Sequence, residues 1–210
     1  MNRRALLQVC GTTLCGTVSA GCLGNDAADA DDTPDTPDAD WVEAPDLGDV
    51  NARAPDPLTA TASVLNHGTF TRPPMVTVTL GVTDGQAHLV GPFSGDGGPF
   101  AGVILAGDGH DERLRLGESH AVESINGCWQ WAGNDEPAYV RVAPDTDAAV
   151  DLEIVPAATG NPTDRPGCFL TGTYRATPTV GVYDADAAPT NDAPEERTDE
   201  VVPTLEVTLL

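Results

Sequence analysis

Residues Met75–Val82 have the sequence MVTVTLGV, in which apolar side chains alternate with small polar ones. Val76, Val78 and Leu80 fall on one face of an extended chain, because successive side chains of a strand point to opposite faces. The threonines between them fall on the other face, and β-branched residues fit this conformation well. The stretch therefore predicts a strand with one buried face.

Short stretches of this kind recur along the chain, and Gly, Pro, Asp or Asn separates nearly every pair. No stretch long enough to form a helix has its apolar residues at helical spacing. We therefore predict an all-β fold, an antiparallel β-sandwich, with Pro178 as a bend or edge position. Strands are expected at Leu58–Leu65, Ala87–Val90, Gly102–Ala106, Ala121–Ile125, Cys128–Trp131, Tyr139–Ala143, Val150–Val155, Thr171–Tyr183 and Val201–Leu209.

The composition excludes some classes of protein. The 210 residues include 33 acidic and 10 basic side chains, giving a formal net charge of −23, and every basic residue is arginine. A nucleic-acid-binding protein needs a basic face, and a helical bundle carries many lysines on its surface. The apolar fraction of 40% is enough for one core, so we expect a single domain with or without a tail.

The absence of lysine from so acidic a chain indicates adaptation to very high salt. At about 1 M salt the Debye length falls to roughly 3 Å, so the acidic side chains hardly repel one another. In dilute buffer the same charge would weaken the compact state. The alternative is an ordinary acidic protein from a GC-rich genome.

The first residues have the pattern of a signal peptide. Met1–Arg4 is short and basic, and the apolar run Ala5–Ala20 is shorter than the roughly 17–25 residues that span a bilayer. Small residues then lead to Cys22. We predict a signal peptide over residues 1–21, with an uncleaved membrane anchor as the alternative.

Two motifs in this region resemble known export signals. The stretch N-R-R-A-L-L, with Arg3 and Arg4, resembles a twin-arginine signal, and S-A-G-C resembles a lipobox ending at Cys22. Together they resemble those of haloarchaeal Tat-dependent lipoproteins. The resemblance implies export, lipid modification of Cys22, and a protein anchored on the outer face of the cell membrane. Two lipid chains anchor a protein stably, whereas one does so only marginally.

An acidic segment follows the lipobox. Residues 25–54 hold ten acidic residues, three prolines and few large apolar ones. Such a composition buries too little apolar surface to offset the entropy of ordering. We predict a disordered tether over residues 22–54 and a β-sandwich ectodomain over residues 55–210. Trp41-Val42 is the main apolar interruption, and we expect it to pack loosely on the domain rather than form a separate contact motif.

The ectodomain resembles immunoglobulin-like sandwiches that include the BsuPI-type intracellular-proteinase-inhibitor-like domains and haloarchaeal lipoprotein ectodomains. The resemblance implies an immunoglobulin-like β-sandwich. Because Tyr174 follows Cys168 instead of preceding it by two residues, only the sandwich architecture carries over, without the antibody framework. The residues that carry it are Leu65-Asn66-His67-Gly68, Pro73–Val78, Cys128-Trp129, Ala143-Pro144-Asp145, Cys168 and Gly172-Thr173-Tyr174-Arg175.

The five cysteines divide by position. Cys10 and Cys15 leave with the signal peptide, Cys22 takes the lipid, and Cys128 and Cys168 remain in an exported domain. These two predict one disulfide bond, with a metal or redox pair as the alternative. A blue-copper site is not expected, because neither cysteine is closely followed by His or Met.

Two short motifs suggest chemistry only loosely. Asp108, Asp111 and Glu112 on a glycine-rich loop are possible Ca²⁺ ligands, although such clusters in an acidic protein are usually solvated turns. The stretch G-E-S-H-A around Ser119 resembles a nucleophile elbow, but a strand or turn rather than a helix is expected after it. We therefore expect no catalytic residues, no enzyme activity and no cofactor other than a possible calcium ion.

Trp129 and Trp131 lie at alternate positions and share one face of a strand. They either pack in the core or at a sheet edge, or form an aromatic platform for a partner or glycan. Residues Phe93–Phe100 form a second candidate contact loop. We predict an externally displayed binding module whose partner is an envelope or membrane protein. The alternative is a lipoprotein that delivers a small ligand or Ca²⁺ to a membrane transporter.

Overall fold

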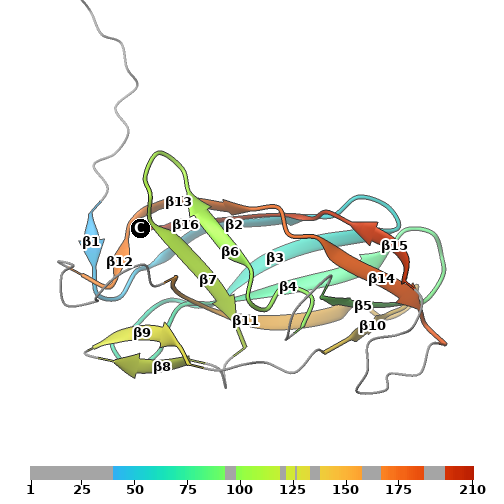
Figure 1. The fold of residues 1–210 in the computed structure, drawn as a ribbon, viewed down its shortest axis with the longest axis horizontal. Coiled ribbons are helices and arrows are strands. Elements are labelled where there is room, and N and C mark those ends of the chain that lie inside the picture. Colours follow the sequence, from blue (N-terminus) through green and yellow to red (C-terminus); the bar gives the residue numbers. More distant parts are fainter. Residues whose placement is uncertain are drawn as a thin grey trace, which may run out of the picture. The chain divides into compact units, whose positions relative to one another are not determined.

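The computed structural model describes residues 40–92, 98–118, 122–125, 127–132, 138–157, 167–186 and 197–210, and Figure 1 shows their arrangement. Every regular element in these ranges is a β-strand, and none of their segments is a helix that could span a membrane. The strands are β1 Trp41–Val42, β2 Leu47–Arg53, β3 Leu58–Asn66, β4 Met75–Val82, β5 His88–Pro92, β6 Ile104–Gly107, β7 Arg113–Gly117, β8 Val122–Ile125, β9 Cys128–Trp131, β10 Val140–Val142, β11 Ala148–Pro156, β12 Phe169–Leu170, β13 Gly172–Ala176, β14 Val180–Asp184, β15 Arg197–Val201 and β16 Thr204–Leu209.

Eight strands form the large sheet, in the order β2-β16-β13-β6-β7-β11-β4-β3, and all neighbours are antiparallel. Its two edge strands, β2 and β3, are consecutive in the chain and lie side by side. The sheet therefore curls into a nearly closed barrel. A small sheet in the order β10-β5-β14-β15 completes the sandwich.

The strands of the small sheet are continuous in sequence with strands of the large one. β4 leads into β5 and β13 into β14, whereas β10 leads into β11 and β15 into β16. The chain thus forms two long antiparallel ribbons that pass from one sheet to the other. The ribbons pair through β5 and β14 in the small sheet and are separated by β6 and β7 in the large one.

One core is shared by the two sheets. Val76, Val78 and Leu80 of β4 are fully buried, as the alternation in MVTVTLGV predicts. The small sheet contributes Val90 and Val182 to the same cluster. The all-β antiparallel sandwich is thus confirmed.

Prolines divide two of the expected strands. Residues 171–183 were expected as one strand, but β13 and β14 lie in different sheets, and Pro178 lies between them. Pro203 likewise separates β15 from β16. Proline lacks the N–H that an uninterrupted ladder needs, so the ribbon of β13–β14 and β15–β16 is interrupted on both of its strands where it changes sheets. β4 and β9 have the bounds that were expected.

The predicted boundary between tether and domain is wrong. The tether was expected to reach residue 54, but residues 47–53 form β2, which pairs with β16. Leu47 is only 4% exposed and Ala52 only 8% exposed. This strand was missed because it follows a strongly acidic segment and its own apolar residues do not alternate strictly. Residues 1–39 lie outside the described part.

Two further sheets have two strands each and share no hydrogen-bonded ladder with the larger sheets. Among the described residues, β1 pairs only with β12, and β8 pairs only with β9. Trp41 and Val42 therefore pack on the domain through a ladder, with Val42 against the core. The β8–β9 hairpin packs against β11 of the large sheet.

Candidate binding groove

A groove of about 330 Å³ lies between the β8–β9 hairpin and the outer face of β6, β7 and β11. This volume is within the roughly 300–1,000 Å³ typical of ligand sites. The strands bring together residues that are far apart in sequence. The lining residues are Ile104, Arg113, Arg115, Gln130, Trp131, Pro156 and Ala157.

Strand β7 has the sequence RLRLG, and its alternation forms one wall of the groove. Leu114 and Leu116 point inward and are almost completely buried. Arg113 and Arg115 therefore point outward on the same face. This strand was not predicted, although alternating arginine and leucine is the pattern of a half-buried strand.

Trp131 fixes the position of Arg115. The guanidinium carbon of Arg115 lies 4.2 Å from the centre of a Trp131 ring, a cation–π contact. The same indole lies on Gly117, where any Cβ would collide with the ring. Glycine at this position lets the Trp131 indole approach the backbone of β7 closely, beside Arg115.

The two groove arginines have no carboxylate partner among the described residues. By contrast, Arg175 contacts Asp108 at 2.8 Å and Glu206 at 2.5 Å. The Nε of Arg115 is buried and has no hydrogen-bond acceptor. In a chain with 33 acidic residues, two unpaired guanidinium groups at one groove are an unusual local concentration of positive charge.

Glu153 lies on the outer face of β11 but is only 7% exposed. Its cross-strand partner on β7 is Gly117, which Trp131 covers, so the hairpin buries this part of the sheet. The Oε2 atom of Glu153 has no hydrogen-bond partner. Burial raises the pKa of the Glu153 carboxyl above its ordinary value.

We expect Glu153→Gln to flatten the dependence of stability on pH. The folded protein retains the Glu153 proton to a higher pH than the unfolded chain. In the unfolded chain the carboxyl has an ordinary pKa of about 4.3. Stability is therefore lost as the pH rises from about 4.3 through the raised pKa, and Gln removes that loss.

Chemical denaturation at several pH values measures this effect. The free energy of unfolding of Glu153→Gln should exceed that of the wild type by more at neutral pH than at pH 4. Glu123→Gln, which removes an exposed carboxylate of β8, is the control. If the free energy of unfolding had the same pH dependence in the wild type and in Glu153→Gln, the expectation would be contradicted.

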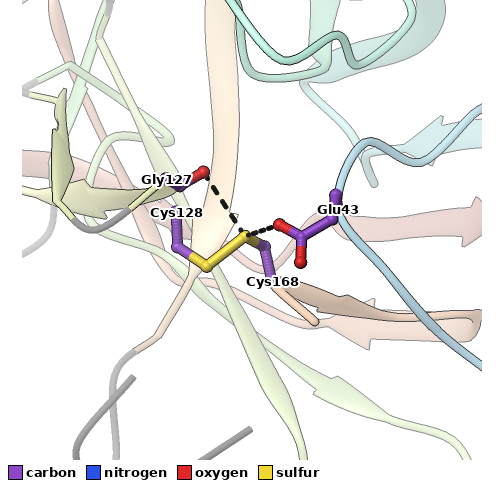
Figure 2. The surroundings of a disulfide bond; sticks show 4 residues. All are labelled: Glu43, Gly127, Cys128 and Cys168. Atoms are coloured by element: carbon purple, nitrogen blue, oxygen red, sulfur yellow. Dashed lines mark hydrogen bonds between the residues drawn. A yellow bond between two sulfur atoms is a disulfide. The ribbon is translucent and has the colours of Figure 1, made fainter. Parts of the chain in front are cut away.

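The predicted disulfide is present between Cys128 and Cys168, whose Cα atoms are 5.2 Å apart. It joins β9 to the segment that leads into β12, and so connects the two small two-stranded sheets. Figure 2 shows the Glu43 carboxylate directed at this bond. The Oε2 atom of Glu43 lies 2.9 Å from Cys168 Sγ, and the Gly127 carbonyl oxygen lies 3.5 Å from it. A disulfide sulfur carries no hydrogen, so these are sulfur–oxygen contacts.

Glu43, Cys128 and Cys168 are the one group of three metal-type donors that converges within the described residues. Both sulfur atoms are used in the disulfide, so the group offers a single carboxylate in this oxidised form. The possible calcium ligands Asp108, Asp111 and Glu112 do not form such a group. Asp108 is instead paired with Arg175.

The two tryptophans have different surroundings. Trp129 packs against the hydrophobic core, whereas Trp131 lines the groove. Trp131 is therefore the one of the pair that faces a candidate binding site. Other sequence-predicted positions lie outside the described residues, namely Arg3, Arg4, Cys22, Ser119 and most of Phe93–Phe100.

A larger hollow of about 470 Å³ lies between β6 and the end of β13. Its charged side chain is Arg175, which is already held by Asp108 and Glu206. The smaller groove at Trp131 therefore offers more unused binding chemistry. Comparison with protein-family models, with curated proteins and with solved structures found no match to this chain.

Proposed function

We propose that this protein is a binding module displayed on the outer face of the cell membrane and anchored there by a lipid on Cys22. The groove at Arg113, Arg115 and Trp131 is its contact site. Its partner is an envelope or membrane protein. The groove arginines, which have no carboxylate partner among the described residues, are the single observation that carries the proposal. Arg115 is half-buried and its Nε is buried without an acceptor, which is costly unless a partner supplies one, and the exposed Arg113 adds a second positive charge beside it.

The anchored location rests on the N-terminal motifs and on the cysteine chemistry. A lipobox ending at Cys22 follows a twin-arginine motif. The Cys128–Cys168 disulfide supports an oxidising compartment, since such bonds are rare in the cytosol. A second candidate function is a carrier that passes a small ligand to a membrane transporter, and the small volume of the groove favours it.

Site-specific photo-cross-linking tests the proposal and separates the two functions. A benzoylphenylalanine at Gln130 lies in the groove, and one at Thr61 lies on an exposed position of β3. Both variants are added to native membranes at multimolar salt, and the adducts are identified by mass spectrometry. We expect a recurrent stoichiometric protein adduct from position 130 only. Adducts common to both positions would contradict the groove as contact site, and no protein adduct would favour the carrier.

A further inference from the structure

We infer that the groove binds an extended acidic segment of the partner protein, whose carboxylates at alternate positions pair with Arg113 and Arg115. This inference rests on the proposed function and names the chemistry that the groove recognises. The partner segment is a peptide with acidic residues at positions i and i+2.

The spacing of the two arginines supports an extended peptide. Arg113 and Arg115 are two residues apart on β7 and share its outer face. Residues at i and i+2 of a strand are separated by about 7 Å. Carboxylates at i and i+2 of an extended ligand have the same separation, so one segment lying along β7 can present one carboxylate to each arginine.

Arg115 is also prepared for such a contact. Stacking on Trp131 holds the plane of the Arg115 guanidinium, and Gly117 leaves room for that indole. A planar guanidinium in a fixed orientation binds a carboxylate through two parallel hydrogen bonds. Ordering the side chain before the ligand arrives reduces the entropy that binding must offset.

The surroundings match an acidic peptide in charge and polarity. No described carboxylate pairs with Arg113 or Arg115, so both charges are available. Ile104, Pro156 and Ala157 provide apolar surface for the peptide backbone and small side chains, and Gln130 provides an amide. Partly buried charge pairs are screened by salt much less than exposed ones, so we expect the half-buried Arg115 to supply most of the recognition at multimolar salt.

Titration of the full-length protein with synthetic peptides tests this inference. The first peptide carries aspartates at alternate positions between threonines and valines. The second has the same composition, but its aspartates are adjacent. The third has the sequence of the first with asparagine in place of each aspartate. Binding is followed by calorimetry and by the ¹⁵N resonances of the arginine Nε–H groups. We expect only the first peptide to bind well and to shift the resonances of Arg113 and Arg115.

Variants locate the site. Arg113→Gln and Arg115→Gln should each weaken binding of the first peptide about tenfold, since a charge-assisted pair is lost in each. Arg72→Gln removes the same charge from the connection between β3 and β4 and should leave the affinity unchanged. Circular dichroism confirms that all three variants remain folded.

Each other outcome overturns the inference. Equal affinity for the first two peptides would exclude recognition of spacing, and equal loss with Arg72→Gln would exclude the groove. No binding of the first peptide, or tighter binding of an acidic polysaccharide such as polygalacturonate, would exclude an acidic peptide as the ligand. Cross-linking from Gln130 can succeed in each case, so failure here is distinguishable from failure of the proposed function.

Discussion

Replacing both Cys128 and Cys168 by serine is expected to lower the free energy of unfolding by about 4 kcal/mol. The bond closes a loop with a sequence separation of 40, and the unfolded chain gains conformational freedom when it is removed. Guanidinium unfolding in high salt measures the loss. Reduction of the wild type should reproduce it, while the double-serine variant should not respond to the reductant. Unchanged unfolding midpoints in both experiments would contradict the expectation.

Removal of the disulfide should first destabilise the region around the groove. The ladders β1–β12 and β8–β9 include no strand of the two larger sheets, and the disulfide joins these two regions. Amide hydrogen exchange should therefore increase in β8 and β9 at denaturant concentrations that leave β4 and β11 protected. Since β9 carries Trp131, the double-serine variant should also bind the partner less tightly.

Replacing Tyr174 by alanine is expected to destabilise the protein by about 3–5 kcal/mol, the range for removing a large aromatic side chain from a core. Tyr174 is fully buried on β13. Its ring packs edge-on against His110, and its hydroxyl donates a 2.6 Å hydrogen bond to the Leu170 carbonyl. The substitution leaves a cavity and a buried carbonyl without this donor. Thermal and chemical unfolding measure the effect.

Tyr174→Phe separates these two contributions. It keeps the ring against His110 and removes only the hydroxyl that bonds to Leu170 in β12. The expected loss is about 1–2 kcal/mol, because a buried acceptor loses its donor. A loss as large as that of Tyr174→Ala would show that the hydrogen bond, rather than ring packing, dominates.

The parts of the fold that depend on local pattern could be predicted from the sequence. MVTVTLGV has a strict alternation, and β4 has the expected bounds and buried face. The cysteine pair could be predicted because only two cysteines follow Cys22. β2 could not, since it directly follows an acidic segment that resembles a tether and its buried residues depend on pairing with the distant β16.

The groove depends on contacts between distant segments, which a local pattern does not contain. Trp131 was one of two equivalent tryptophans in the sequence, and only the packing of β9 on the large sheet distinguishes it from Trp129. Glu153 lies in an alternation that predicts an exposed side chain. It is buried because a hairpin from elsewhere in the chain covers that face.

The pairing of β2 with β16 has a consequence for how the molecule is made. β16 lies between β2 and β13, so the large sheet lacks a strand until residues 204–209 have been synthesised. Pairings between such distant segments are slow to form, because a long loop must close before any contact is gained. Until then β2 and β13 expose unpaired edges, which are the surfaces through which nascent chains aggregate.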